Sequence, residues 1–425
     1  MTPGTRHRLI VAMVWTLRIV IGATFVMSGL AKAIDIWGFV YKIEEYVAVW
    51  GLPWWRSMSF LCALGVAGLE FVMGAMMMVG AFRRSVAWVG VLVMAFMLPL
   101  SLYIYLANPV SDCGCFGDFL VISNGATFAK NVLLTAGVIV LAIYNRRAGT
   151  LYNPYLQWVP MLACGVYVLI VALVGYNIQP LVDFRSFPIG SELLRSDADA
   201  DSAPSRLVYE RDGQRQEFTL DALPDSSWTF VEVVADQPAH ALTDFAIIDD
   251  GLDIAPDIIN TEGDQMLIVI PELARADISY TPMLNDLADR MEARGENVTA
   301  LISGDEEGLN FWRDISLASY PVYVAEPTLL KELARGTMSL VKLHDGRVEW
   351  KRTVSSMSFD EYTDENGVPV LRRGPVLSAI VLHGPATLAV ASALLVALLV
   401  VIGMPGWIAS IVSLIRRKDG KKKAE

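Results

Sequence analysis

Charged residues are scarce in this sequence. Asp, Glu, Lys and Arg make up only 19% of the 425 residues, whereas hydrophobic residues make up 54%. The mean hydropathy is +0.44. Because an ordinary soluble domain carries about 25% charged residues, the composition excludes a protein that is soluble throughout. It predicts a chain that is largely embedded in a membrane.

Cysteine is also rare, with four residues in the whole chain. Two of them, Cys113 and Cys115, lie one residue apart in the polar loop 111–118 (SDCGCFGD), between two long apolar runs. Neither a histidine nor a second cysteine pair is near the loop, and a structural zinc site needs four ligands. The loop is therefore predicted to hold no zinc, and its chemistry is expected to be that of thiols.

Six apolar segments are long enough to cross a bilayer, which takes about 20 residues. The first of them follows a basic start and could be mistaken for a signal peptide. Its apolar stretch exceeds the usual core of about 7–15 residues, so we expect it to be retained as an anchor. The predicted spans are 10–31, 58–82, 85–107, 126–144, 156–176 and 377–402.

Lys and Arg clusters predict the orientation of these spans. With both termini in the cytoplasm of a bacterial cell, every main cluster falls on the cytoplasmic side of the inner membrane. The cysteine loop and the acidic middle of the chain, about 184–373, would then be periplasmic, in a compartment that permits disulfides. The clusters are Arg6 with Arg8, Arg83 with Arg84, Arg146 with Arg147, and 416–423.

The pattern predicts an all-α membrane bundle joined to an α/β soluble domain. The membrane part comprises a four-helix domain and two further spans, one on each side of the soluble part. The expected divisions are 1–150 for the four-helix domain, 151–183 for the fifth span, 184–243 for a linker and β-hairpin region, 244–355 for the α/β domain, 356–376 for a linker, and 377–425 for the last span with its basic tail.

Two charged residues, Arg18 and Glu70, fall near mid-membrane when they are counted from opposite ends of the first two spans. Each would cost about 2.5–3.5 kcal/mol if it were unpaired, so the economical hypothesis is that they pair between adjacent antiparallel helices. Lys32 is nearer the outer end of the first span. A strut between helices and a proton or quinone site are alternative roles for these charges.

The Cys113-Gly114-Cys115 segment is the strongest candidate for chemistry. A disulfide across so short a ring would be strained and would exchange readily, and as a staple it would remove little entropy from the unfolded chain. We therefore favour a redox pair over a static bridge. Cys62, near the outer end of the second span, is either a partner thiol or an apolar filler, and Cys164 is expected to be a filler.

Two further features have competing explanations. The segment 36–55 is rich in Trp and Tyr, which predicts a short helix in the outer interface that is either an ordinary aromatic belt or a lid over a site. Met73 and 76–78 could handle Cu(I) together with the loop cysteines. Lipid-facing or gap-filling methionine is the favoured interpretation.

Four stretches resemble the DoxX/MauE-like membrane proteins. They are 25–32 (FVMSGLAK), 68–70 (GLE), 113–118 (CGCFGD) and Lys130-Asn131. The resemblance covers roughly residues 10–145. It implies a four-helix bundle associated with thiol redox processes or with the maturation of exported redox proteins. The stretch 181–190 is similar to the linker that joins such a bundle to a soluble domain.

The soluble part resembles the thioredoxin/peroxiredoxin-like fold over about 244–352. Strands are predicted at 245–248, 266–270, 298–302, 340–343 and 348–352, helices at 282–292 and 306–314, and a preceding hairpin within 206–234. The thiol of that fold is missing from 271–277 (PELARAD), and Met338 stands where the fold has its cis-proline. The resemblance therefore implies a binding module that is not catalytic.

Together these features predict a thiol-redox-associated inner-membrane protein, either a thiol–disulfide or a quinone-linked oxidoreductase. The alternative is a scaffold or maturation factor for envelope proteins that is not an enzyme. The expected partners are the lipid bilayer and an extracytoplasmic client protein, with no nucleic acid and no metal, and a quinone is the one candidate cofactor. The candidate site residues are Cys113 and Cys115 as the redox pair, with Cys62, Glu70, Arg18 and Lys32 as possible partners.

Overall fold

The chain forms two compact units in the computed structural model. The helical unit comprises Met1–Val182 and His383–Glu425, and the α/β unit comprises Asp183–Leu382. The described residues are 3–110, 114–120, 122–194, 206–211, 214–219, 229–234, 245–249, 251–357 and 380–422, so Cys113 lies outside them.

Six helices in the described part of the chain are long and apolar enough to cross a membrane, which confirms the prediction of a multi-pass membrane protein. A seventh, shorter helix, α2 (Ile36–Val49), and the 3-10 turn η1 (Pro53–Met58) join the first two spans, as the aromatic segment predicted. The six long helices are α1 (Pro3–Ile34), α3 (Ser59–Val79), α4 (Arg83–Ala107), α5 (Asn124–Tyr144), α6 (Trp158–Asn177) and α13 (Gly384–Lys422).

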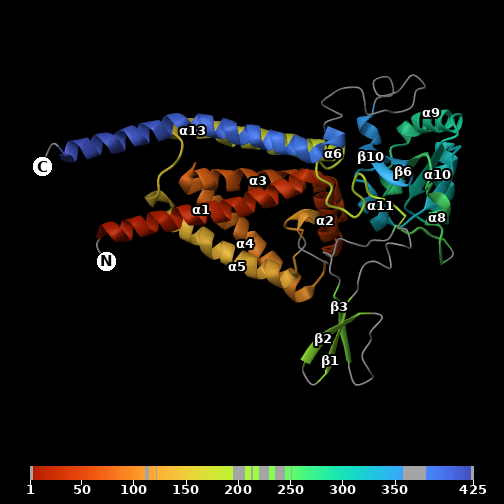
Figure 1. Ribbon diagram of the computed structural model, residues 1–425, viewed down its shortest axis with the longest axis horizontal. Coiled ribbons are helices and arrows are strands. Elements are labelled where there is room, and N and C mark those ends of the chain that lie inside the picture. The colour runs from red at the N-terminus through yellow and green to blue at the C-terminus, as the bar shows by residue number, and fades with distance from the viewer. Residues whose placement is uncertain are drawn as a thin grey trace. The chain divides into compact units, whose positions relative to one another are not determined.

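Helices α1 and α3 pack with their backbones close together, while α4 and α5 run side by side (Figure 1). A Cβ atom at Gly74 would lie 2.5 Å from the carbonyl oxygen of Gly22, and one at Gly29 would lie 2.5 Å from the backbone nitrogen of Phe71. Small residues allow this approach, which is how helices associate where lipid is as apolar as their side chains. In contrast, Gly65 has open space around it.

Replacing Gly74 by alanine is expected to push α1 and α3 apart and to lower the stability of the helical unit, by about 1–3 kcal/mol as in other overpacked interiors. The thermal unfolding temperature of the full-length protein in detergent would report this. Gly65→Ala on the same helix is the matched control, and it should leave the temperature unchanged or raise it slightly because alanine favours helix. Equal effects of the two changes would contradict the close packing.

Helix α13 is held against the rest of the helical unit by two tyrosines. The hydroxyl of Tyr167 on α6 lies 2.7 Å from the hydroxyl of Ser392, and the hydroxyl of Tyr152 donates to the carbonyl of Leu399 at 2.8 Å. Polar contacts of this kind join helices in lipid. The last span is therefore a packed member of this unit as well as a second anchor for the segment before it.

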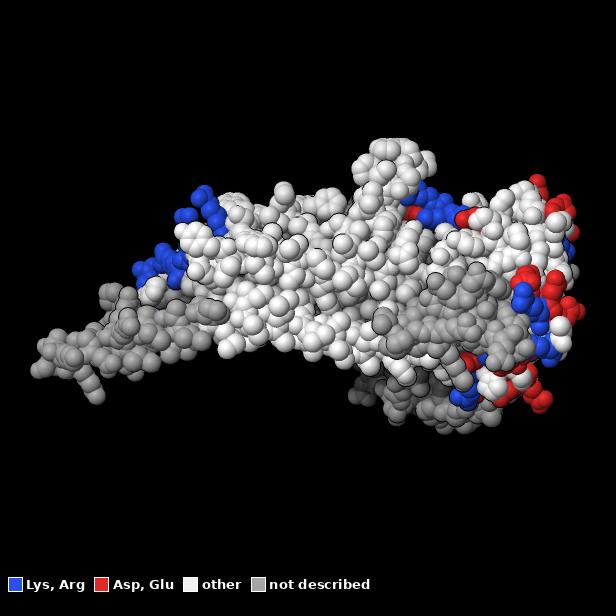
Figure 2. Space-filling model, turned by 90° about the horizontal axis from the view of Figure 1, so that it is seen from above, with Lys and Arg blue, Asp and Glu red and all other residues white. Residues whose placement is uncertain are grey.

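Two of the arginine clusters lie at the same end of the helical unit. Arg83 donates from Nη1 to the carbonyl oxygens of Arg146 at 3.3 Å and Ala148 at 2.7 Å, which ties the α3–α4 turn to the segment after α5. Figure 2 shows Lys and Arg side chains at one end of this unit, followed by a long stretch of its described surface without charge. This pattern fits a membrane-spanning unit. The predicted orientation of the unit in the membrane depends on the same arginine clusters.

The α/β unit is built on a mixed five-stranded sheet with the order β10-β9-β6-β7-β8. Strands β6, β7 and β8 run parallel, whereas β9 is antiparallel to both β6 and β10. The central strands are almost wholly buried, which matches their unbroken apolar sequence. The bounds are β6 (Asp264–Ile270), β7 (Asn297–Ile302), β8 (Val322–Val324), β9 (Ser339–His344) and β10 (Arg347–Thr353).

Helices α9 (Thr281–Glu292), α10 (Glu306–Ser316) and α11 (Pro327–Leu333) connect these strands. Leu330 and Leu333 of α11 pack with Leu267, Leu301 and Val341 in one apolar core. The segment before the sheet forms a short exposed hairpin and one helical turn, and Ala255 and Ile258 of the turn join the same core. These elements are β4 (Ile248–Asp249), β5 (Leu252–Asp253) and α8 (Ala255–Ile258).

Most of the predicted strands and helices of the α/β unit are confirmed, with two differences. The strand predicted at 245–248 is reduced to the two residues of β4, and β8 and α11 were not predicted. The hairpin within 206–234 is present and gains a third strand, giving an antiparallel sheet of β1 (Arg206–Arg211), β2 (Gln214–Thr219) and β3 (Thr229–Val234). The similarity to a thioredoxin-like fold stays a prediction.

Candidate functional site

A buried charge pair joins α1 and α3 in the helical unit. Lys32 Nζ on α1 donates to Glu70 Oε2 on α3 at 2.6 Å, and the two side chains are 4% and 5% exposed. Lys32 also donates to the hydroxyl of Ser28, one helical turn earlier, at 2.7 Å. This spacing of four residues places both groups on one face of α1. Each charge therefore has its partner inside the protein, as the high cost of an isolated charge in lipid requires.

The predicted pairing of Arg18 with Glu70 is wrong. Arg18 donates to the side-chain and backbone oxygens of Asn145 at 2.6 and 2.9 Å, and to the carbonyl of Gly149 at 2.7 Å. The hydrogen bonds of the Arg18 guanidinium are therefore made at the end of the unit that carries the arginine clusters. Glu70 pairs with Lys32 of α1 instead, because Lys32 and Glu70 lie at the same level along the two packed helices.

The cysteine loop is attached directly to this charge pair. The hydroxyl of Ser28 lies 2.6 Å from the carbonyl oxygen of Cys115 and 2.7 Å from Glu70 Oε2, so its single proton can serve either acceptor. Gly114 has φ +65°, and a Cβ there would lie 2.7 Å from the side chain of Lys42. The position before Cys115 thus needs glycine both for its backbone conformation and for its close contact with α2.

Helix α2 is fixed at its start by Asp35, whose carboxylate accepts from the backbone N–H of Gly38 at 3.0 Å. Such a cap satisfies a helix N–H that would otherwise lack a partner. Next to it, Trp37 donates from its indole N–H to the carbonyl of Tyr176 at 2.9 Å and stacks on that residue's ring. These contacts tie α2 to α6.

Beneath α2 is an apolar cavity of about 370 Å³. Lys32, Gly114 and Cys115 lie in its wall together with Cys62 from α3. The rest of the lining is apolar or aromatic and comes from α2, η1, α3 and α4: Phe39, Ile43, Tyr46, Val47, Trp50, Leu52, Trp55, Val66, Phe96, Met97 and Leu100. The cavity favours an apolar molecule that presents a polar group to Lys32.

The structure brings most of the sequence-predicted residues together. Lys32, Cys62 and Cys115 line one cavity, and Glu70 accepts a hydrogen bond from Lys32. Cys164 is fully buried, as expected of a filler. Cys113 is outside the described residues, so its part in the site stays a prediction.

The methionines of α3 are part of the core. Met73, Met76 and Met77 are at most 3% exposed, and Met73 and Met77 pack with apolar residues of α1, α4 and α5. Among the described residues, no group of three or more His, Cys, Asp or Glu side chains could hold a metal ion. The buried packing of Met73 and Met77 fits the gap-filling interpretation of these methionines.

Sequence reasoning missed the residues that α4 contributes to the cavity. Phe96, Met97 and Leu100 are part of an unbroken apolar span, so nothing in the sequence separates them from residues that face lipid. For α2, the unusual density of aromatic residues was the signal. The structure supports the lid interpretation of α2, because α2 and the segment after it supply most of the aromatic wall of the cavity.

Residues from four stretches of the sequence meet around Cys115. Cys115 also lines a small pocket of about 30 Å³ together with Ser28 and Glu70, and Lys130 and Asn131 of α5 belong to the same pocket. The ammonium of Lys130 lies 4.5 Å from the centre of the Phe116 ring. The loop is therefore held between α1, α3 and α5 on one side and the cavity on the other.

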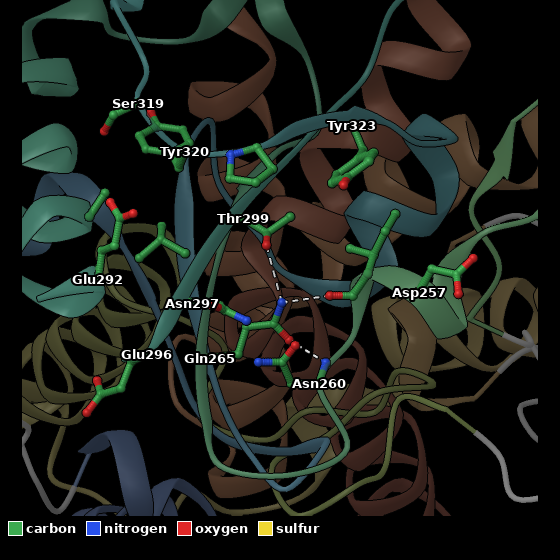
Figure 3. Close-up of a pocket in the computed structure, with 14 residues that line it drawn as sticks. Asp257, Asn260, Gln265, Glu292, Glu296, Asn297, Thr299, Ser319, Tyr320 and Tyr323 are labelled. Carbon is green, nitrogen blue, oxygen red and sulfur yellow. Dashed lines mark hydrogen bonds between the residues drawn. The ribbon is translucent and has the colours of Figure 1, made fainter. Parts of the chain in front are cut away.

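The α/β unit has a separate, polar cavity of about 310 Å³, shown in Figure 3. Its centre is Gln265, which accepts from the backbone N–H of Asn260 at 2.8 Å and donates to the carbonyl of Ile258 at 2.8 Å and to Thr299 Oγ1 at 3.2 Å. Gln265 and Asn297 stand at the amino ends of β6 and β7, whereas ligands of open α/β sheets bind outside the carboxyl ends. We therefore assign Gln265 a structural role.

Two segments of the chain match protein-family models. Residues 10–144, which run from within α1 to the end of α5, match the model described as methylamine utilisation protein MauE. Residues 205–236, which include β1 to β3, match a domain of unknown function, DUF8463. No curated protein and no solved structure matches the chain.

Proposed function

We propose that this chain, whose residues 10–144 form a MauE-family membrane domain, carries out thiol–disulfide exchange at the membrane with Cys113 and Cys115 as the exchanging pair. The observation that carries the proposal is the hydrogen bond from Ser28 to the carbonyl of Cys115, which attaches the loop to the buried Lys32–Glu70 pair. The description of the family names methylamine utilisation and no thiol step. The thiol step is our own proposal from the loop.

The reaction has two exchange steps. A client thiolate attacks the Cys113–Cys115 disulfide, forms a mixed disulfide and releases one loop cysteine as its thiolate. A second client thiolate then displaces the other loop cysteine, so that the client gains a disulfide and the loop becomes a dithiol. The α/β unit contains no cysteine, so in this scheme it recognises the client and leaves the chemistry to the loop.

Separate Cys113→Ser and Cys115→Ser variants of the full-length protein are expected to test this scheme. One of them should accumulate a mixed disulfide with a client in intact membranes, because the remaining thiol cannot complete the exchange. Non-reducing electrophoresis followed by mass spectrometry would detect the product. Cys164→Ser is the matched control, since this buried thiol should leave the pattern unchanged. If neither loop variant traps a partner and neither changes the phenotype of cells that carry the protein, the loop does not take part in thiol–disulfide exchange.

The midpoint potential of the loop separates this function from that of a scaffold with a static bridge. Exchanging pairs have potentials of about −120 to −270 mV, whereas structural disulfides are below about −300 mV. Alkylation of the native protein across a series of thiol buffers gives the value. A midpoint in the higher range supports exchange, and a bridge that resists mild reductant supports a scaffold that acts through its α/β unit alone.

A further inference from the structure

The cavity beneath α2 has an opening toward the surface of the helical unit. A shallow depression of about 480 Å³ on α4 shares Trp50, Phe96 and Leu100 with the cavity and adds Pro99 and Tyr103. Phe96 is 60% exposed although it belongs to a candidate span. In a membrane this surface would face acyl chains. The cavity and the depression therefore form one apolar path, with an enclosed part for a head group and an open part for a tail.

The head-group end of the path has a particular chemistry. Phe39, Tyr46 and Trp55 supply aromatic surface, which packs well against a flat ring. Lys32 is the charged residue in the wall. Its hydrogen-bond partners among the described residues are Ser28 and Glu70, and its ammonium lies 5.2 Å from the centre of the Phe39 ring, so one of its three N–H groups remains to donate to an acceptor on a ligand. Because Glu70 neutralises the lysine, the site favours a neutral acceptor over an anionic head group.

We infer that the cavity binds an isoprenoid quinone, with its ring under α2, one carbonyl oxygen accepting from Lys32 and its tail along α4. A quinone combines a flat neutral ring, carbonyl acceptors and a long apolar tail, which are the three properties of the path. A phospholipid has the tail, but its phosphate would require a positive charge that Glu70 already compensates.

The position of Cys115 in the wall gives this ligand a role that rests on the proposed function. When the loop has been reduced by a client, it holds a dithiol. Oxidation back to the disulfide releases two electrons and two protons. The quinone takes up both electrons and both protons and leaves as the quinol. The loop is thereby returned to the disulfide form that the next client needs.

Binding of decylubiquinone to the full-length protein in nanodiscs tests the site without reference to thiol exchange. We expect saturable quenching of tryptophan fluorescence, since Trp50 and Trp55 line the cavity. Ile43→Trp should weaken binding by about tenfold or more, because the indole occupies space that the ring needs. Leu92→Trp is the control, as this residue is exposed on α4 and does not line the cavity.

A photoreactive azidoquinone gives a second measurement that needs no substitution, and it should label peptides of the cavity wall, from α2, η1, α3 or α4, in the wild-type protein. Binding that does not saturate, equal affinities of Ile43→Trp and Leu92→Trp, or labelling elsewhere would overturn the inference. Displacement of the quinone by phosphatidylglycerol would assign the cavity to a phospholipid and also overturn it. Saturable binding without oxidation of the loop dithiol would leave the quinone site in place and contradict only its redox role.

Discussion

Replacing Asp183 by asparagine is expected to lower the free energy of unfolding of the α/β unit by about 3–5 kcal/mol, the usual effect of removing one partner from a buried ion pair. The Asp183 carboxylate accepts two hydrogen bonds from the guanidinium of Arg185, at 2.7 and 2.9 Å, one from the backbone N–H of Arg185 at 3.2 Å, and one from Lys351 at 3.0 Å. The side chains of Arg185 and Lys351 are 1% and 2% exposed. Asparagine keeps the shape of the aspartate but leaves two buried cations without their counter-charge.

The same residue makes the stability depend on pH. Burial alone would raise the pKa of Asp183, but the charges and hydrogen bonds of Arg185 and Lys351 outweigh burial and hold the pKa well below its ordinary value of 3.8. The stabilisation is therefore complete above about pH 3.8 and is lost as the pH falls below that value. Burial lowers the pKa of Lys351 to about 8, although Asp183 opposes the shift. Protonation of this lysine in the folded unit thus relies on the aspartate.

Hydrogen exchange of peptides from β6 and β9 in the full-length protein would measure both effects. The peptides of the wild-type protein should lose protection against exchange on acidification toward pH 3. The Asp183→Asn variant should have lower protection at neutral pH, and its protection should change less with pH. Asp286→Asn is the matched control, because its pair with Arg290 is exposed on α9 and should contribute at most about 0.5 kcal/mol. Equal protection of the two variants at neutral pH would show that the buried cluster contributes little.

The sequence was a good guide to the spans and to the buried strands. Long apolar runs have few alternatives to crossing a membrane, and the unbroken apolar residues of β6 and β7 point to a sheet covered on both faces. Strand β8 was missed because three residues carry too little pattern. Its place in the sheet comes from pairing with β7, which is a long-range contact.

The site was predicted only in part. Counting from the ends of the predicted spans placed Arg18 and Glu70 at similar depths, but in the packed pair of helices Arg18 lies beside Gly80, whereas Ser28 and Lys32 lie beside Glu70. The sequence alone does not give this register between α1 and α3, which is set by their close packing at the glycines. The cavity depends on residues from α2, α3 and α4 together. It therefore emerges only from the packed structure.

Replacing Lys32 by methionine is expected to destabilise the helical unit by about 3–5 kcal/mol, because Glu70 would remain buried without its counter-charge. Glu70→Leu should have a similar effect by leaving Lys32 unpaired. The double variant should recover most of the loss, since an apolar pair of similar size often replaces a buried ion pair at little cost. This strong departure from additivity is the mark of two residues in direct contact.

Thermal unfolding of the full-length protein in detergent gives the three stabilities. Arg56→Met is the control, because the Arg56 side chain is 47% exposed and its pair with Glu44, at 3.3 Å, should contribute little. The double variant also distinguishes the two roles that the charges could have. If it regains stability but its loop no longer exchanges with clients or with quinone, the pair serves the chemistry, because Ser28 then lacks the carboxylate that shares its proton. If stability and exchange both return, the pair is a strut between α1 and α3.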